Sequence, residues 1–339
     1  KKYIRSNHGR LPPKAMARQL GIEVKHVRRA MRELGLHVAE EIAAEKRNQR
    51  AAGRFLRNEK FAKILDRIKS PKVAWPLVFL LAFALRAVHL FQVDDSPFSL
   101  MLHGDPALYH AWAVKISEGD WLGQAFPVFY LGPGYAYFLA ALYSLFGTSP
   151  WAVALVQVFI GALSAGLVYE LGRRLFGPAT GLIAGLLAAC NPMLIFTSSL
   201  IMGASLIILL NLLMLLMIAI AMPRPAWWKW LLAGMFLGLS ALFRGNVLLF
   251  GPFAVVAVMA YYGWDNRRRW LSAALLMFTA CVLTLAPIGL HNFLIGEDVA
   301  PLTTNAGANF FIGNHPDSDG LYLGEARDKG GATGRGVRE

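Results

Sequence analysis

Long apolar runs, separated by short polar stretches, constrain the fold of this chain more than any other feature of its sequence. The runs lie at about residues 73–93, 151–172, 178–196, 199–221, 227–243, 247–263 and 271–290. Each is close to the ~20 apolar residues that a helix needs to cross the hydrocarbon core of a bilayer. Charged residues make up only 16% of the chain, whereas a soluble domain has about a quarter. We therefore expect an all-α fold: a polytopic membrane helix bundle of about seven spans.

Positive charge is concentrated before the first apolar run. Residues 1–72 hold 20 Lys and Arg against 7 Asp and Glu, whereas residues 73–339 hold 14 of each kind. Because basic flanks of membrane helices stay in the cytoplasm, we expect the N-terminus there. Seven spans then place every basic cluster between spans on that same side. These clusters are Arg173–Arg174, Arg224 with Lys229, and Arg267–Arg269.

The pattern divides the chain into four parts. We expect a soluble helical head over residues 1–37, a basic linker helix over 38–72, a membrane domain over 73–290 with an outer loop at 94–150, and an outer loop or truncated tail over 291–339. Segment 134–147 is short and rich in Tyr and Phe, so we interpret it as an amphipathic helix at the outer interface. The alternative is a true span, which would move Arg173–Arg174 and Arg267–Arg269 to the outside.

The ends of the chain and its cysteines add little structure of their own. The first apolar run begins near Val73, too late for a signal peptide. The missing initial Met and the Gly-rich C-terminal end are typical of a fragment of a longer protein. Cys190 and Cys281 both lie in apolar runs, where a cysteine behaves as a small core residue.

The head has the apolar spacing of two short helices on either side of Gly21. The apolar positions are Met16, Ala17, Leu20, Ile22, Val27, Ala30, Met31 and Leu34. With a small residue at Ala17, a turn at Gly21 and a β-branched anchor at Val27, residues 14–36 resemble a helix-turn-helix. In that case the second helix places Lys25, Arg28, Arg29 and Arg32 in a DNA groove. The alternative is a small helical bundle whose basic face lies against anionic lipid headgroups.

Segment 94–133 is the longest polar stretch between apolar elements and carries five carboxylates. Asp105 has the most suggestive position, because it stands before Pro106 at the start of a helix expected over 107–118. A carboxylate at a helix start near a membrane surface suits a general base, with Tyr109 and His110 about one turn away. The alternative is that Asp105 is only the N-cap of that helix.

Two arginines lie at the outer ends of apolar runs. Arg86 is inside the first run, where a charged side chain usually faces a partner or a wet cavity. It therefore either binds a phosphate group or extends to the headgroups. Arg244 lies in the outer turn between two runs, against the positive-inside trend, which favours phosphate binding over a structural ion pair.

Five segments, taken in order, resemble bacterial family-39 glycosyltransferases of the protein O-mannosyltransferase type, which are membrane enzymes of the GT-C class. The segments are LHGDPALYHAWAVKISEGDWLG, PGYAYFLAALYSLFG, VQVFIGALSAGLVYELGRRLFG, GLSALFRGNVLLF and APIGLHNFLIGEDVAPLTTNAGANFFIGNHPDSDGLY. The resemblance implies a bacterial inner-membrane enzyme that transfers a sugar from a polyprenyl-phosphate donor to an acceptor protein or glycolipid on the non-cytoplasmic side.

The resemblance also assigns roles to particular residues. Asp105 matches the acidic residue that serves as catalytic base in the first outer loop. His291 stands where the family has an arginine, and we expect it at the donor phosphate with Arg86 and Arg244. Contacts to the sugar or the acceptor are expected from Tyr109, His110, Asn246 and Asn292.

Several polar positions of the family are missing here. Pro106 and Ala107 replace a second acidic residue, and residues 203–205 are Gly-Ala-Ser in place of a charged motif. The alternative function is therefore a catalytically weak or inactive membrane-tethered regulator or scaffold, whose basic head binds DNA, protein or anionic lipid. We see no nucleotide or cofactor motif, and we interpret Asp317 and Asp319 as solvated carboxylates of a glycine-rich turn. The alternative is that they hold a cation together with His315.

Overall fold

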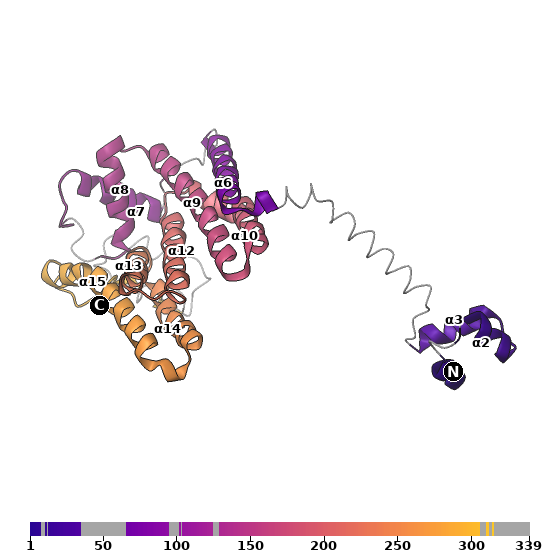
Figure 1. Cartoon of the computed structure of the whole chain (residues 1–339). Coiled ribbons are helices and arrows are strands. Elements are labelled where there is room, and N and C mark those ends of the chain that lie inside the picture. Colours follow the sequence, from indigo (N-terminus) through magenta and orange to yellow (C-terminus); the bar gives the residue numbers. More distant parts are fainter. Residues whose placement is uncertain are drawn as a thin grey trace. The chain divides into compact units, whose positions relative to one another are not determined.

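The computed structural model describes residues 1–7, 11, 13–34, 66–94, 102, 104–124, 129–305, 310–311 and 314. Within these residues every regular element is a helix and no strand occurs, which confirms the expected all-α class. The chain forms two compact units, Lys1–Ile68 and Lys69–Glu339, which are described separately (Figure 1).

The smaller unit contains α1 (Lys2–Asn7), α2 (Pro13–Leu20) and α3 (Val24–Glu33). Their shared core consists of Ile4, Met16, Ala17, Val27 and Met31. Gly21 connects α2 to α3 with φ 65°, which glycine adopts at no steric cost. The two helices expected around Gly21 are present, although Leu20 and Ile22, expected inside, are exposed. Most of the expected linker helix lies outside the described residues.

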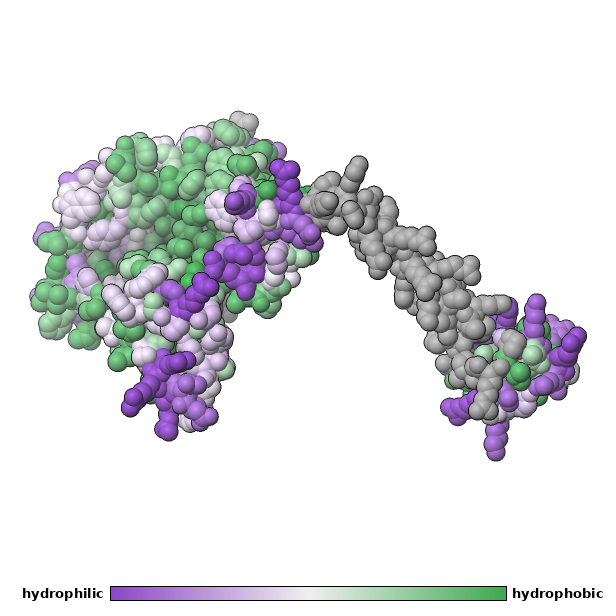
Figure 2. Space-filling model, in the orientation of Figure 1, coloured by the Kyte–Doolittle hydropathy of each residue, from purple (hydrophilic) through white to green (hydrophobic). Residues whose placement is uncertain are grey.

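The larger unit contains five helical segments that are long and apolar enough to cross a membrane. They are α6 (Pro71–Asp94), α9 (Pro150–Phe176), α12 (Ala204–Ala221), η1 (Gly245–Leu249) joined to α14 (Phe250–Tyr262), and η2 (Trp264–Asn266) joined to α15 (Arg267–Leu294). A bent pair, α10 (Pro178–Cys190) and α11 (Pro192–Ser199), makes a sixth if counted as one span. The seventh expected span is the shorter helix α13 (Trp227–Phe243). The chain is thus a multi-pass membrane protein with five or six qualifying spans, and hydrophobic residues dominate the visible surface of this unit (Figure 2).

The span expected over residues 178–196 is broken in the middle. α10 and α11 meet at an angle of 51°; Asn191 lies between them, and Pro192 is the first residue of α11. Proline lacks the N–H that would continue the ladder, and its ring clashes with the preceding turn. The side chain of Asn191 accepts a hydrogen bond from the backbone N–H of Leu194 at 3.1 Å and so caps the new helix.

Glycines allow the closest helix contacts. A Cβ at Gly181 would lie 2.5 Å from the backbone nitrogen of Arg173, and one at Gly234 would lie 2.0 Å from the carbonyl oxygen of Met277. These positions join α10 to α9 and α13 to α15. Close approach through small residues is the usual means by which membrane helices gain packing energy, since lipid provides no hydrophobic driving force.

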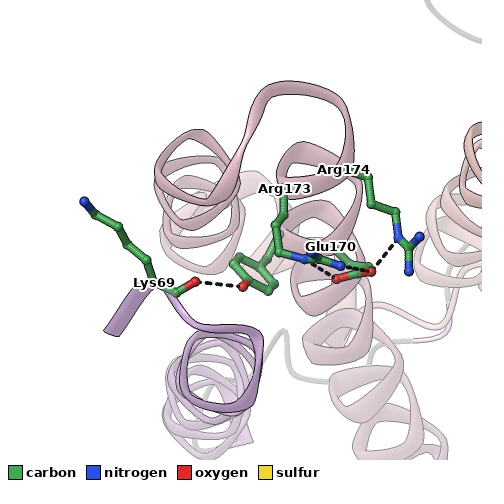
Figure 3. A network of polar contacts seen from close by, with 5 residues as sticks. Lys69, Glu170, Arg173 and Arg174 are labelled. Atoms are coloured by element: carbon green, nitrogen blue, oxygen red, sulfur yellow. Dashed lines mark hydrogen bonds and ion pairs between the residues drawn. The ribbon is translucent and has the colours of Figure 1, made fainter. Parts of the chain in front are cut away.

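Basic side chains gather where α6 begins and α9 ends (Figure 3). Glu170 accepts hydrogen bonds from Arg173 at 2.7 Å and Arg174 at 2.5 Å, and the Tyr169 hydroxyl donates to the carbonyl of Lys69 at 3.3 Å. Positive charge at the C-terminal turn of α9 also complements the helix dipole. We call this region, together with the Arg224–Lys229 and Arg267–Arg269 turns, the basic end of the bundle.

The basic turns lie at the same end because the helices that carry them are aligned. Ser205 and Ile208 of α12 line one cavity with Gly161 and Ala165 of α9, so these two helices pack side by side. The Tyr262 hydroxyl, at the end of α14, donates to the carbonyl of Met222 at the end of α12.

The opposite end, which we call the Asp105 end, is built from α7 (Asp105–Ser117) and α8 (Pro133–Phe146). At 14 residues α8 is about 21 Å long, too short for a hydrocarbon core of about 30 Å. The segment 134–147 is accordingly not among the candidate spans. Its inner face is buried against α7 in an aromatic core that includes Tyr109, Trp112, Tyr135 and Tyr143.

Candidate functional site

Asp105 occupies the first position of α7, and its side chain does not cap the helix. The N-cap is Gly104 with φ 62°, and no side chain bonds to the helix start there. Asp105 is exposed, and its carboxylate makes no hydrogen bond or ion pair with another described residue. The carboxylate is therefore available to a ligand, as a base requires.

Arg244, the cation expected at the donor phosphate, immediately follows α13. Its backbone N–H bonds to the carbonyl of Ser240 at 3.2 Å and fixes the end of the helix. The guanidinium is exposed and pairs with no carboxylate of the described residues. Asn246, two residues later in η1, is also exposed. The expected turn thus presents both polar side chains outward.

Tyr109 responds to both of these charges. Its side chain is buried, and its ring packs edge-on against Tyr135 with centroids 5.0 Å apart. Burial first, and then the negative charge of Asp105, raise the pKa of Tyr109 to about 12, while the positive charge of Arg244 acts in the opposite direction. Both charges therefore act on one hydroxyl, which stays protonated at neutral pH and serves as a hydrogen-bond donor rather than a base.

His110, the other residue expected beside Asp105, points into the α7–α8 contact. Its Nδ1 lies 2.8 Å from the hydroxyl of Tyr143, and the two rings meet edge-on. Burial raises the pKa of Tyr143 to about 12, so this hydroxyl too stays protonated. The pair joins the helix that carries Asp105 to α8.

A buried polar chain that sequence reasoning missed continues inward from Tyr135. The Tyr135 hydroxyl donates to Oε1 of Gln157 at 2.8 Å, and Nε2 of Gln157 donates to the carbonyls of Ser198 and Leu200. Gln157 and Tyr135 are fully buried. The sequence does contain a signal for this chain: Gln157 is an amide inside an apolar run. A polar group buried in a membrane needs a hydrogen-bond partner, so such an amide indicates a buried polar contact.

His291 and Asn292 organise loops at the C-terminal end of α15. The ring of His291 stacks on Phe129 at 4.2 Å, and its Nε2 donates to the carbonyl of Leu122. Asn292 is fully buried and donates to the carbonyls of Ala300 and Leu302. Its Oδ1 accepts from the backbone N–H of Phe129. These contacts occupy the polar atoms expected to meet phosphate or sugar, apart from Nδ1 of His291.

Arg86 lies at the break between α10 and α11 and is 1% exposed. Its guanidinium donates to the carbonyls of Ala82, Ala188 and Ala189 at 3.1–3.3 Å. The last two are among the unpaired carbonyls at the end of α10, so the arginine caps the negative end of that helix. Arg86 and Ser205 also line a cavity of about 20 Å³, large enough for one water molecule.

The structure thus brings together only part of the predicted site. Asp105, Tyr109 and Arg244 share one electrostatic environment, whereas Arg86, His291 and Asn292 hold helices and loops in place. Among the described residues no group of three His, Cys, Asp or Glu side chains is arranged to hold a metal ion. Asp317 and Asp319 lie outside the described residues.

The position of Arg244 depends on glycines at the start of α8. A Cβ at Gly132 would lie 2.5 Å from the carbonyl oxygen of Phe243, and one at Gly134 would lie 3.1 Å from the Phe243 ring. The backbone before α8 thus packs directly on the end of α13. This contact joins the start of α8 to the end of α13, which carries Arg244.

Comparison with known proteins gives one match. The family model described as dolichyl-phosphate-mannose-protein mannosyltransferase matches residues 131–290. No curated protein and no solved structure matches the chain. The matched region begins at the Gly132 contact, includes Gln157 and Arg244, and ends one residue before His291. Residues 131–290 are therefore a domain of the dolichyl-phosphate-mannose-protein mannosyltransferase family.

Proposed function

We propose that the chain transfers a mannose-type sugar from a polyprenyl-phosphate donor to an acceptor hydroxyl at the Asp105 end of the bundle. The family domain supports the donor class and a mannosyltransferase reaction. The observation that carries the assignment of the site is the pair of exposed opposite charges, Asp105 and Arg244, which both act on Tyr109. Charges that are held near each other without an ion pair are available for a charged substrate.

The reaction can be written with the residues present. The carboxylate of Asp105 takes the proton of the acceptor hydroxyl, and the acceptor oxygen bonds to the anomeric carbon of the donor sugar. The bond from that carbon to the phosphate oxygen breaks, and the lipid phosphate leaves with the electron pair. A guanidinium can hold two phosphate oxygens, so Arg244 stabilises the leaving group. We assign the contacts to the sugar to Tyr109 and Asn246.

The orientation proposed for this reaction follows from charge. The basic end faces the cytoplasm because Lys and Arg are retained on that side of a membrane, so the Asp105 end faces away from it. Cysteines introduced at 105 and 173, with Cys190 and Cys281 replaced by alanine, test the arrangement in intact cells with an impermeant thiol reagent. Labelling at 105 alone supports the orientation, and labelling at 173 from outside refutes it.

Asp105→Asn tests the base directly. The amide cannot accept the proton, so transfer from a polyprenyl-phosphate-mannose donor should fall by at least ~100-fold, the lower end of a general base's contribution. Glu118→Gln is the matched control, because Glu118 is exposed at the far end of α7 and pairs only with Lys115. Unchanged transfer by Asp105→Asn, at equal expression, would remove the base from the proposal.

The geometry of the head supports a second candidate function, in which a catalytically weak membrane part tethers a binding module. Lys25, Arg28, Arg29 and Arg32 are all exposed on α3, while Val27 and Met31 of the same helix are buried. Lys25 pairs with Glu23 and Arg29 with Glu33, so part of this charge is already neutralised. A DNA duplex and an anionic bilayer are the two partners that this basic face fits.

Salt and sequence dependence separate the two partners. Binding of the detergent-solubilised chain to duplex DNA should weaken steeply with salt, because phosphate contacts release counterions. If α3 contacts base edges, Arg32→Ala should cost ~1–3 kcal/mol on a preferred sequence. Equal binding to all duplexes, together with binding to anionic vesicles, would instead assign the head to the membrane surface.

A further inference from the structure

We propose that the loop Gly119–Gln124 is a carbohydrate-binding subsite, separate from the reacting centre, that holds a sugar ring of the acceptor. The assignment to the acceptor rests on the proposed function, whereas sugar binding by the loop does not. Five residues of the loop, Gly119, Asp120, Trp121, Leu122 and Gln124, line an open surface hollow of about 400 Å³. This volume lies within the range of ~300–1,000 Å³ typical of small-molecule sites, although the hollow does not enclose a ligand.

The backbone of this loop is fixed by its own hydrogen bonds. Gly119, with φ 115°, ends α7 in a Schellman motif: its N–H bonds to the carbonyl of Ile116, and the N–H of Asp120 bonds to that of Lys115. A turn follows, in which the N–H of Gly123 bonds to the carbonyl of Asp120 at 3.0 Å. Oδ1 of Asp120 accepts from the N–H of Gln124 at 2.7 Å.

Two side chains from other helices hold the tip of the loop. The Tyr137 hydroxyl of α8 donates to the carbonyl of Trp121 at 2.9 Å, and Nε2 of His291 of α15 donates to the carbonyl of Leu122. With both carbonyls fixed inward, the side chains of Trp121 and Leu122 remain 57% and 59% exposed. The loop is preorganised, so a ligand does not have to order it on binding.

The chemistry of the lining fits a sugar. The indole face of Trp121 offers a flat apolar surface for the C–H face of a pyranose ring. The Asp120 carboxylate accepts hydrogen bonds from hydroxyl groups, and the Gln124 amide both donates and accepts. A phosphate-bearing ligand is disfavoured, because the cavity presents a carboxylate and the neighbouring Lys115 is paired with Glu118.

The position of the cavity separates it from the reacting atoms. Asp105 and Gly119 lie at opposite ends of α7, which at 13 residues is about 20 Å long. If the hydroxyl of an acceptor reacts at Asp105, the sugar ring bound by the loop must therefore belong to a part of the acceptor about 20 Å from that hydroxyl. The competing explanation for the exposed Trp121 and Leu122 side chains is that they insert into lipid. Insertion would remove the water that hydrates Asp120 and Gln124, and lipid cannot replace the hydrogen bonds of that water.

Sugar binding is tested on the full chain carrying Asp105→Asn, in detergent, so that the result does not depend on transfer. The probes are methyl α-mannopyranoside, an α-linked mannobiose and methyl β-glucopyranoside, observed by saturation-transfer NMR. Trp121→Ala should weaken binding of the best probe at least tenfold. Asp120→Asn should also weaken it, although an asparagine Oδ1 can still accept from Gln124. Trp264→Ala, at an exposed tryptophan in η2 at the basic end, is the matched control and should leave binding unchanged.

Three results would overturn the proposal. The first is that the parent chain binds none of the probes, and the second is that Trp121→Ala and Trp264→Ala weaken binding equally. The third is that Trp121→Ala leaves sugar binding intact and reduces insertion into vesicles of neutral phospholipid, which would make the loop a membrane anchor. None of these outcomes bears on whether Asp105 catalyses transfer, which is measured separately with the Asp105→Asn and Glu118→Gln pair.

Discussion

Gly132 packs so closely on the carbonyl of Phe243 that a methyl group in place of its hydrogen would lie 2.5 Å from the oxygen. Backbone contacts of this kind cannot give way as a flexible side chain does. The two segments joined here are far apart in sequence: one begins α8, which packs against α7, and the other leads directly to Arg244. The α7–α8 pair and the end of α13 thus meet in a contact between two main chains.

Gly132→Ala should therefore separate the α7–α8 pair from α13. We expect a loss of stability of ~1–3 kcal/mol, as for other overpacked sites, and a larger loss of transfer activity than of stability. Thermal unfolding and transfer assays of the same preparation measure the two effects. Gly245→Ala is the control, since its Cβ would meet only Leu302, at an ordinary 3.5 Å. Wild-type activity in Gly132→Ala would show that the contact between Gly132 and Phe243 does not determine the geometry of the candidate site.

Arg244→Gln should remove the charged contact to the donor phosphate. Hydrogen bonds to charged groups contribute ~1.5–3 kcal/mol, which corresponds to a ~10–150-fold loss in kcat/KM for the polyprenyl-phosphate donor. Arg267→Gln removes an exposed cation from the basic end and should leave this constant unchanged. Equal effects of the two substitutions would indicate a general dependence on charge rather than a phosphate site.

Because of Tyr109, the stability of the Asp105 end should depend on pH in the alkaline range. Its pKa is raised to about 12 in the folded chain, so folding favours the protonated phenol. The stabilisation is complete below the unfolded pKa of about 10 and is lost as the pH rises toward 12. A shift of about two units corresponds to about 3 kcal/mol. Tyr109→Phe should flatten the fall in unfolding temperature between about pH 10 and 12, and an unchanged profile would exclude Tyr109 as its source.

Gln157 links α9 to α8 and to the connector before α12, so Gln157→Leu should leave the buried Tyr135 hydroxyl and the Ser198 carbonyl without their partner, whereas the Leu200 carbonyl keeps the N–H of Met202. We expect it to cost ~2–4 kcal/mol, because each unsatisfied buried group costs ~1–3 kcal/mol and some relaxation occurs. Tyr135→Phe removes one bond and should cost ~1 kcal/mol. In the double variant the two losses should not add, since both remove the same Tyr135–Gln157 bond. Full additivity in denaturation experiments would show that this bond contributes nothing.

The helices and the exposed charges could be predicted from the sequence, but the contacts between distant segments could not. Apolar runs of about the right length predicted the membrane helices, since length and hydropathy are local properties. The break at Pro192 interrupts a run that hydropathy alone makes continuous. The outward-facing Asp105 and Arg244 were also predicted, because each lies at the end of a helix.

Residues whose partners come from far along the chain were assigned less well. Arg86 was expected at a phosphate or the headgroups, but its partners Ala188 and Ala189 are about a hundred residues later and offer only backbone oxygens. No side-chain pattern marks such acceptors. His291 and Asn292 likewise bond to backbone groups of remote loops. The roles expected for these three residues in donor or sugar binding stay predictions.

The cap that Arg86 places on α10 has a consequence for how the protein is made. A chain enters the membrane in the order of synthesis, so α6 arrives while the carbonyls that will receive its guanidinium have not yet been translated. An arginine within a membrane helix raises the free energy of insertion by up to ~2.5–3.5 kcal/mol, the value at the helix centre. The first span thus remains a marginal membrane segment until α10 has been synthesised, so insertion of α6 is completed only when α10 leaves the ribosome.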